Sequence, residues 1–346
     1  MRVLLTGHEG YIGSVMAPAL VEAGHDVVGL DTGYFADCNI VPPAGGVAAV
    51  NKDIRDLEAA DVEGFEAVIH LAALSNDPIG NLNDSWTEEI NYQGSVRLAE
   101  LAREAGIQRF LFSSSCIMYG MSEAAVVDET APLDPKTEYA RSKVRAEQAI
   151  SDLASDTFSP TFLRNGTVYG LSPRMRFDTV FNDLLGRAVA TKKVVVYGDG
   201  VPWRPVVHVK DLVRAFIAAL EAPREAIHNE AFNNGADHLN HQVGELARIA
   251  VEAVPGCELE VLDQPGADQR TYKADFSKWA RTFPDCEFEW TPERGATELR
   301  EAFEAIDLSL EDFEDKRFTR LKWLNHLLES GAVDGELRWT GVGATA

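Results

Sequence analysis

The first half of the chain alternates short apolar runs with longer segments of mixed polarity. Apolar runs of strand length lie at residues 3–6, 27–30, 47–50, 67–73 and 109–113. One helical segment follows the first run and ends at about Glu22, and a second covers residues 91–105. Continuous apolar strands separated by helices are typical of a parallel sheet covered on both faces. The pattern predicts an α/β fold with a Rossmann-type doubly wound parallel sheet.

The alternation weakens after about Gly170. Strand-like runs are expected at 194–197 and 205–209, and helices at 211–221, 242–253 and 318–328. The last of these helices has an apolar stripe of Leu321, Leu324, Leu327 and Leu328, which we interpret as core packing. A smaller, discontinuous C-terminal domain is therefore predicted beside the doubly wound sheet.

Composition narrows the choice of partners. The 346 residues include 32 Lys and Arg against 55 Asp and Glu, a formal net charge of −23. Such a chain repels phosphate backbones and anionic lipids, which argues against nucleic acid and membrane surfaces as partners. An anionic small molecule remains possible, because backbone N–H groups and a few Arg can bind it locally.

The cysteines and the N-terminus indicate in which cellular compartment the protein is expected. The four cysteines, Cys38, Cys116, Cys257 and Cys286, form no C-x-x-C pair and have no accompanying His cluster. We therefore expect reduced thiols and no metal site. The N-terminus lacks the apolar stretch of a signal peptide, and no run approaches the roughly 18 apolar residues of a membrane span. A soluble cytoplasmic protein is expected.

A glycine-rich turn joins the first strand to the first helix. In the run Thr6-Gly-His-Glu-Gly-Tyr-Ile-Gly13, Gly7 permits a tight turn and Gly10 permits close approach to a pyrophosphate. Gly13 allows the helix and strand to pack closely, and the helix N-terminus supplies N–H donors. This context predicts a dinucleotide-binding site.

Asp31 ends the second strand, 18 residues after Gly13. A carboxylate there accepts hydrogen bonds from an adenosine ribose diol and repels a 2′-phosphate. No Lys or Arg follows it closely. These features favour NAD over NADP, and the alternative is an ordinary surface Asp at a strand end.

Two motifs carry candidate acid/base chemistry. Tyr139 and Lys143 are spaced i, i+4 on a predicted helix and face the same way. An ammonium beside a phenol lowers the phenol pKa from about 10, which suits Tyr139 to general acid/base catalysis. Ser115 lies past the end of the fifth strand, where α/β sheets place ligands. Each motif alone also has a purely structural interpretation. The Tyr and Lys pair could mark a surface helix, and Ser115 could belong to a Ser-rich strand end whose hydroxyls bind the local backbone.

Taken together and in order, these motifs resemble one family. They are joined by Asp53-Ile54, by His70-Leu-Ala-Ala73, and by Gly198-Asp-Gly followed by Arg204 and His208-Val. The chain resembles the extended short-chain dehydrogenase/reductase superfamily, specifically the NAD-dependent nucleotide-sugar epimerase/dehydratase family, over about residues 1–300.

The resemblance implies a catalytic triad. Tyr139 would be the catalytic base, Lys143 would lower its pKa and hold the nicotinamide ribose, and Ser115 would complete the set. Asp53 and Ile54 would lie beside the adenine. The cofactor-binding residues that the motifs imply are Gly7, Gly10, Tyr11, Ile12, Gly13, Asp31, Asp53, Ile54, Leu71, Ala72, Ala73, Asn91, Ser113, Tyr139 and Lys143.

The substrate side is read from the same resemblance. Arg204 and Arg270 would bind a nucleotide diphosphate, for which a planar guanidinium is suited. The substrate-binding candidates are Ser75, Asn76, Ser115, Thr167, Asn182, Arg204 and Arg270. For Ser75 and Asn76, a simple turn built by Asn-Asp-Pro is an equal alternative.

Several positions depart from the family pattern. Cys116 and Ile117 stand where the 4,6-dehydratases carry an Asp-Glu pair, so dehydration is disfavoured. The glucuronate decarboxylases also usually carry a Glu at position 117. Thr167 replaces an Asn that touches the sugar nucleotide, and Asn165 stands where Pro or Tyr is common.

The function hypothesis is a nucleotide-sugar 4-epimerase that oxidises C4 transiently with NAD and re-reduces it from the other face. The alternatives are a UDP-glucuronate decarboxylase, a 4-keto-sugar reductase, or a non-catalytic NAD-binding interaction protein. Residues 1–169 and about 206–234 are expected to bind NAD, and residues 170–205 and 235–340 to bind substrate. The family often forms homodimers through a four-helix bundle, which implies a homodimer here.

Overall fold

The computed structural model describes residues 1–43, 45–75, 79, 82–121, 126–262, 264 and 270–341. Its larger sheet has seven strands in the order β10-β6-β5-β4-β1-β2-β3, all paired in parallel. The strands are β1 (Arg2–Thr6), β2 (Asp26–Asp31), β3 (Ala48–Asn51), β4 (Ala67–His70), β5 (Arg109–Ser115), β6 (Ser159–Asn165) and β10 (Glu230–Asn234). The predicted Rossmann-type fold is confirmed.

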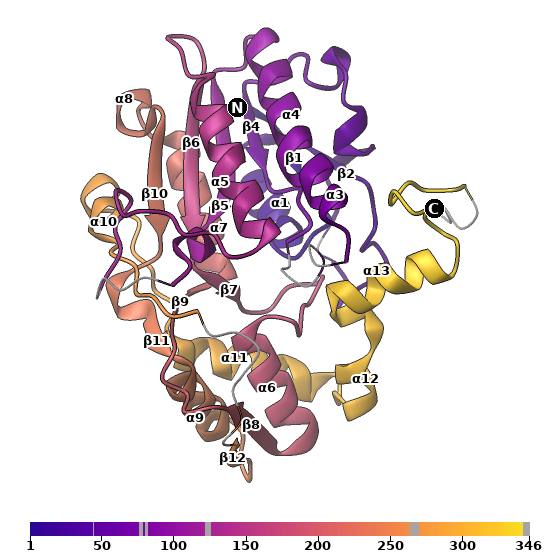
Figure 1. The fold of residues 1–346 in the computed structure, drawn as a ribbon, viewed down its shortest axis with the longest axis vertical. Coiled ribbons are helices and arrows are strands. Elements are labelled where there is room, and N and C mark those ends of the chain that lie inside the picture. The colour runs from indigo at the N-terminus through magenta and orange to yellow at the C-terminus, as the bar shows by residue number, and fades with distance from the viewer. Residues whose placement is uncertain are drawn as a thin grey trace.

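Helices cover both faces of this sheet because successive strand residues point to opposite sides. In β1, Leu4 belongs to a core shared with α4 (Gly94–Glu104) and α5 (Glu138–Ser151), on one face. Val3 and Leu5 belong to a second core shared with α1 (Gly13–Glu22) and α7 (Val209–Glu221), on the other. Figure 1 shows these helices around the sheet.

The second domain lies below the sheet in Figure 1. It contains a three-stranded sheet, β11-β9-β7, and a two-stranded sheet, β12-β8. Its strands are β7 (Thr167–Tyr169), β8 (Lys193–Tyr197), β9 (Trp203–His208), β11 (Asn240–Gln242) and β12 (Glu258–Leu262). Its main helices are α6 (Val180–Thr191), α9 (Val243–Ala253) and α11 (Pro292–Ala305), which share a third apolar core.

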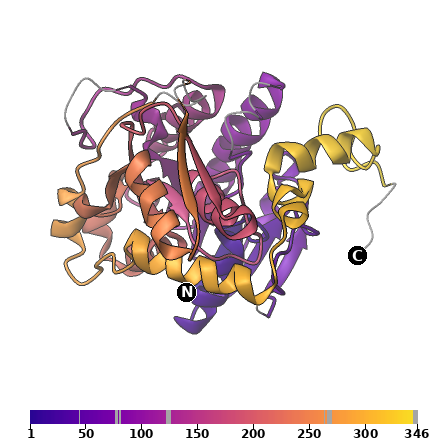
Figure 2. The same ribbon diagram turned by 90° about the horizontal axis from the view of Figure 1, so that it is seen from below.

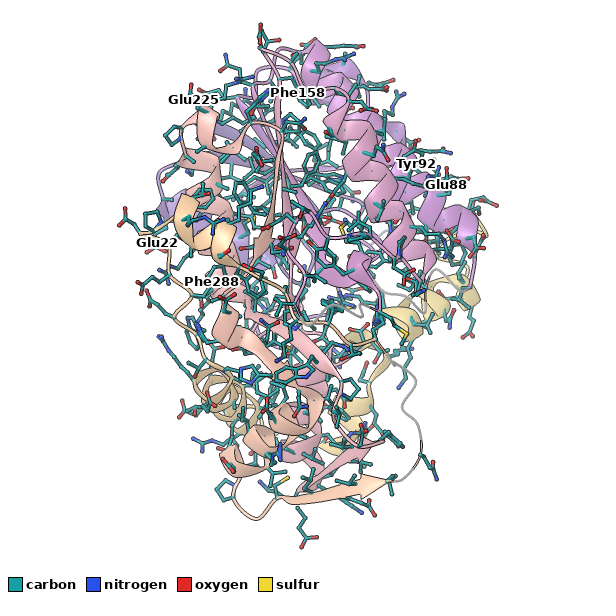
Figure 3. All side chains as sticks on the ribbon, turned by 60° about the vertical axis from the view of Figure 1, so that its left-hand side comes forward. Glu22, Glu88, Tyr92, Phe158, Glu225 and Phe288 are labelled. Atoms are coloured by element: carbon teal, nitrogen blue, oxygen red, sulfur yellow. The ribbon has the colours of Figure 1, made fainter. Side chains whose placement is uncertain are left out.

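Shorter helices complete the chain. They are α3 (Asp84–Trp86), α8 (Arg224–Ile227), α10 (Ser277–Thr282), α12 (Leu310–Glu314) and α13 (Arg320–Glu329). A π-helical stretch over Thr87–Gln93 leads directly into α4. Its residues Glu88 and Tyr92 lie on the outer face of the molecule, as Figure 3 shows.

The chain ends by returning to the Rossmann sheet. Residues 319–341, here called the C-terminal segment, are drawn in yellow on the right-hand side of Figure 2. They contribute Trp323, Leu324 and Leu337 to the core that also contains Leu30 of β2. The indole nitrogens of Trp323 and Trp339 each donate a 2.6 Å hydrogen bond, to the carbonyls of Tyr34 and Thr32. This segment packs into the core that contains Leu4. The assignment of residues 235–340 to a substrate-binding domain stays a prediction.

In the described part of the chain, no helix has the length and apolarity that a membrane-spanning segment requires. The same residues contain no group of three or more His, Cys, Asp or Glu arranged to hold a metal ion.

Candidate active site

A cavity of about 920 Å³ opens at the carboxyl ends of the central strands, between the two domains. This is where parallel α/β sheets bind ligands. Most of the residues singled out from the sequence line it: Gly7, Gly10, Tyr11, Ile12, Gly13, Asp31, Asp53, Ile54, Leu71, Ala72, Ala73, Ser75, Ser113, Ser115, Tyr139, Lys143, Thr167, Arg204 and Arg270.

The turn after β1 tolerates only glycine at two of its positions. Gly7 has φ +74°, and a Cβ there would lie 2.7 Å from the backbone nitrogen of Ala72. A Cβ on Gly13 would lie 2.1 Å from the carbonyl oxygen of Gly7. The loop therefore packs tightly between the residues that follow β4 and the N-terminus of α1, whose first residue, Gly13, lines the cavity.

Asp31 is positioned by backbone donors at the end of β2. Its carboxylate accepts hydrogen bonds from the N–H groups of Glu9, at 3.0 Å, and Gly33, at 2.9 Å. Asp53 caps the turn at Ile54 and is paired with Arg55, Oδ2 to Nη2 at 2.7 Å. The glycine-rich turn, the carboxylate of Asp31 and the wall formed by Ile54 fit the pyrophosphate, ribose and base of a dinucleotide.

Tyr139 and Lys143 lie on the first two turns of α5, which Thr137 caps by accepting a hydrogen bond from the N–H of Ala140 at 3.2 Å. Lys143 Nζ lies 5.9 Å from the centre of the Tyr139 ring and 4.6 Å from that of Phe112. It donates a 2.8 Å hydrogen bond to the carbonyl of Ser113. Burial lowers the pKa of Lys143 to about 8.

Ser115 ends β5 and faces the same cavity. Its hydroxyl oxygen accepts a 3.3 Å hydrogen bond from the N–H of Ile117 and so caps the following 3-10 turn, Cys116–Tyr119. One lone pair of the Ser115 oxygen therefore makes the local hydrogen bond to the backbone that a Ser-rich strand end predicts. The hydroxyl hydrogen is not used in that contact.

The two positions after Ser115 offer no proton-transfer group to a substrate. Cys116 is fully buried and does not line the cavity, and its thiol donates to the carbonyl of Arg164 at 3.1 Å. Burial raises the pKa of that thiol. Ile117 does line the cavity, and its side chain is aliphatic.

Two predicted site residues lie outside the cavity lining. Asn91 brackets the backbone of Leu74, accepting from its N–H at 2.8 Å and donating to its carbonyl at 3.1 Å. Asn182 is fully buried, accepts from the N–H of Gly170 at 3.0 Å and donates to the Tyr11 hydroxyl at 3.0 Å. Both are placed to support cavity walls. Asn76 lies outside the described residues.

The opposite wall carries Arg204 and Arg270. Arg204, on β9, donates to its neighbour Trp203's carbonyl at 2.8 Å and to the carbonyl of Arg270. Thr167, on the adjacent β7, lines the same wall. The two arginines are therefore held close together, as two contacts to one ligand require.

Sequence reasoning missed several lining residues, including Arg176, Asp178, Thr179 and Arg320. Arg176 donates to the Ser75 hydroxyl at 2.8 Å and to its carbonyl at 3.2 Å. The two arginines of Arg174-Met-Arg-Phe-Asp178, shortly after the Tyr169-Gly turn, were a usable signal. No sequence signal marked Arg320, because the other residues that line the cavity are distant from it in the chain.

The parallel sheet, glycine-rich turn and paired Tyr and Lys define a Rossmann enzyme of the short-chain dehydrogenase/reductase class. The sequence profile of the NAD dependent epimerase/dehydratase family matches residues 3–235. The chain belongs to this family. It is therefore an NAD-dependent enzyme, and the predicted family and cofactor are confirmed.

Individual relatives agree with this assignment. The UDP-glucose 4-epimerase of Corynebacterium glutamicum is 30% identical over 321 residues, which cover 87% of this chain and 93% of the relative. The structure of TunA, an NAD-dependent NDP-hexosamine 5,6-dehydratase, has a TM-score of 0.78 at 26% identity and covers 89% of this chain and 99% of that one. The UDP-glucose 4-epimerase of Thermus thermophilus, in complex with NAD, has a TM-score of 0.73 at 26% identity, with coverage of 88% and 99%.

Proposed function

We propose that this protein is a nucleotide-sugar 4-epimerase. The observation that carries the proposal is the combination of Tyr139, Lys143 and Ser115 around one cavity with an aliphatic Ile117 beside them. This set can move the proton of a sugar hydroxyl. Elimination of water across neighbouring carbons would need a further acid or base at positions 116 and 117.

The proposed chemistry begins at the phenol. The residues around the glycine-rich turn and Asp31 would hold NAD, which would supply the hydride chemistry at the sugar carbon. Tyr139 takes the proton of the 4-hydroxyl as that carbon is oxidised, and gives it back during re-reduction. The ammonium of Lys143 favours the phenolate form of Tyr139, and the hydroxyl of Ser115 donates to the same substrate oxygen.

The buried setting suits this role. The hydrogen bond from Lys143 to the Ser113 carbonyl keeps the ammonium on the same face of α5 as the phenol of Tyr139. Glu147, one turn after Lys143 on α5, forms a buried ion pair with Arg164 on β6, Oε2 to Nη2 at 2.8 Å. This pair fixes the helix against the strand. A preorganised acid/base group needs no rearrangement during the reaction.

The substrate is proposed to be a nucleotide diphosphate sugar. Arg204 and Arg270 would bind the diphosphate, and Thr167 would contact the sugar nucleotide. Two relatives named above are UDP-glucose 4-epimerases, which makes UDP-glucose the first substrate to test.

Tyr139→Phe tests the proposal. The variant keeps the ring and removes the hydroxyl, so turnover should fall by at least about 10²-fold, the usual contribution of a general acid/base. NAD binding should stay unchanged. Tyr92→Phe is the matched control, because Tyr92 packs under Arg145 on the outer helical face (Figure 3). Near-normal turnover in Tyr139→Phe would remove Tyr139 from the mechanism.

Product analysis separates the alternatives. Release of CO₂ from a glucuronate substrate would identify a decarboxylase, and stoichiometric consumption of added NADH would identify a ketoreductase. A 4-epimerase releases no CO₂, because it breaks no carbon–carbon bond, and it consumes no added NADH, because its hydride is recycled.

A further inference from the structure

Three buried arginines gather beside the glycine-rich turn. Arg174 and Arg176 follow β7 by a few residues, and Arg320 begins α13 in the C-terminal segment. Their exposed fractions are 7%, 9% and 3%. Removing a guanidinium from water is costly unless an anion accompanies it. The partners of these three groups therefore show whether the cluster is complete in itself.

Two of the arginines have carboxylate neighbours. Arg176 forms a two-pronged pair with Asp178, Nε to Oδ1 at 2.8 Å and Nη2 to Oδ2 at 3.2 Å. Arg174 donates to the carbonyl of Glu9 at 3.1 Å, and its Nη2 lies 3.9 Å from the Glu9 carboxylate. The other terminal nitrogen of Arg174 is buried and has no hydrogen-bond partner among the described residues.

Arg320 is different, since its described side-chain contacts are to uncharged groups. Its guanidinium donates to the carbonyl of Arg174 at 2.9 Å and lies 4.3 Å from the centre of the Phe35 ring. The contact of Arg320 with Asp178 is made by its backbone N–H, at 3.2 Å. Burial, followed by the charge of Arg176, lowers the pKa of Arg320 to about 10 and outweighs the carboxylate of Asp178, which raises that pKa. The cluster thus holds more positive than negative charge.

The position of this excess charge identifies the ligand group. Arg176 and Arg320 line the cavity together with Gly10 and Tyr11 of the glycine-rich turn. Phe35, beneath Arg320, lies four residues beyond Asp31. A dinucleotide whose ribose is bound by Asp31 and whose pyrophosphate lies on the turn would place that pyrophosphate beside Arg320. Planar guanidinium groups bind such oxygens with two parallel hydrogen bonds.

We propose that Arg320 is a cofactor-binding residue, and that it binds the diphosphate of NAD from the side opposite the glycine-rich turn, with Arg176 next to it. The C-terminal segment is then part of the NAD site, although it lies outside the residues that match the family profile. The inference rests on NAD as the cofactor and is independent of which sugar reaction the enzyme performs.

The test compares ligands with and without a diphosphate. Arg320→Gln removes the charge and keeps an amide that can donate to the carbonyl of Arg174. Binding of NAD, ADP-ribose, adenosine, UDP and uridine is measured by calorimetry on the full-length chain after bound NAD has been removed. Arg317→Gln is the matched control, since Arg317 is a more exposed arginine, paired with Asp315, three residues earlier. Arg320→Lys keeps the charge without the planar fork, and it replaces the Gln variant if that variant does not fold.

Arg320→Gln should weaken NAD and ADP-ribose by about 10- to 100-fold, the worth of a charge-assisted hydrogen bond. Adenosine, UDP and uridine should change by less than about two-fold, as should every ligand with Arg317→Gln. Two results would overturn the proposal. Equal weakening of adenosine and NAD would mean that the segment had merely lost its packing. Weakened UDP with unchanged NAD would assign Arg320 to the diphosphate of the sugar nucleotide. Neither result would bear on 4-epimerisation.

Discussion

Lys143 is a charged group in a place where burial opposes charge. Its side chain is 3% exposed, and its ammonium is held by the Ser113 carbonyl and the faces of two aromatic rings. Its neighbour Glu147 raises its pKa, but burial outweighs that effect. The protein therefore maintains this cation at a cost in stability, which is expected of a group kept for catalysis.

Lys143→Met should reveal that cost through pH. The pKa of Lys143 is about 8 when folded and about 10.4 when unfolded, so the unfolded chain binds more protons between these values. The free energy of unfolding of the wild type should rise, relative to the variant, by about 3 kcal/mol between pH 7 and pH 10.5. Denaturant titrations across this range measure it, with Lys322→Met on exposed α13 surface as the control. If the difference in free energy of unfolding between wild type and Lys143→Met did not change with pH, Lys143 would not be a buried cation with a lowered pKa.

At the residue scale, the sequence predicted what lies within one element and missed what depends on a second one. The spacing of Tyr139 and Lys143 places both on one helix face, so geometry required no knowledge of the tertiary fold. Asn182 lies outside the cavity lining for a local reason. Helix α6 begins at Val180, which lines the cavity, and Asn182 lies about 200° further round the helix. Arg320 reaches the cavity only through tertiary packing.

Among the elements, the central strands were predictable and two outer ones were not. The runs at 3–6 and 67–73 are continuous and apolar, which marks β1 and β4. In contrast, β6 and β10 were not predicted, because they bury polar side chains that pair with one another. Asn234, for example, donates to Asn165 at 2.7 Å across these two strands. Buried polar pairs satisfy each other in the fold but look like loop residues in the sequence.

The C-terminal segment is the element whose role the structure changed most. Its leucine stripe predicted core packing, but the composition gave no indication of which core. Trp323 is nearly buried against the first domain, and the carbonyls of Glu336 and Leu337 accept hydrogen bonds from Arg55 at 2.7 Å and 3.1 Å. Arg55 in turn holds Asp53 at the cavity. The segment therefore stabilises the part of the cavity wall where we expect the base of the cofactor to bind.

Trp323→Ala should lower the free energy of unfolding by about 3–5 kcal/mol, because it removes a buried indole and its hydrogen bond to Tyr34. Lys322→Ala, on the neighbouring exposed position of α13, should change it by less than about 0.5 kcal/mol. Urea denaturation of both variants provides the comparison. If the two variants were equally stable, α13 would not be part of the first domain's core.

At the scale of the whole molecule, two domains meet around one cavity. Tyr11 belongs to the glycine-rich turn of the first domain, yet its side chain packs in the core of the second. Its hydroxyl donates to the Gly170 carbonyl at 2.6 Å and accepts from Asn182. The glycine-rich turn and helix α6 are thus joined by one buried side chain, which holds these two walls of the cavity together.

Charge is also organised on this scale. The chain carries a net charge of −23, while the cavity wall includes Arg176, Arg204, Arg270 and Arg320. The overall acidity argued against polyanionic partners, and the local arginines suit a small diphosphate. Sequence composition could give the first of these facts but could not locate the second.

In the proposed reaction, the phenol of Tyr139 moves the 4-hydroxyl proton of a nucleotide sugar while the hydrogen on that carbon is carried and returned. Proton NMR of UDP-, dTDP-, GDP- and CDP-sugars incubated with the enzyme in D₂O tests this reaction. We expect at least one, with UDP-glucose the first candidate, to give its C4 epimer with the original hydrogen retained at C4 and no deuterium on the ring. Deuterium at C5, loss of CO₂, or no epimer from any member of the panel would show that the enzyme is not a nucleotide-sugar 4-epimerase.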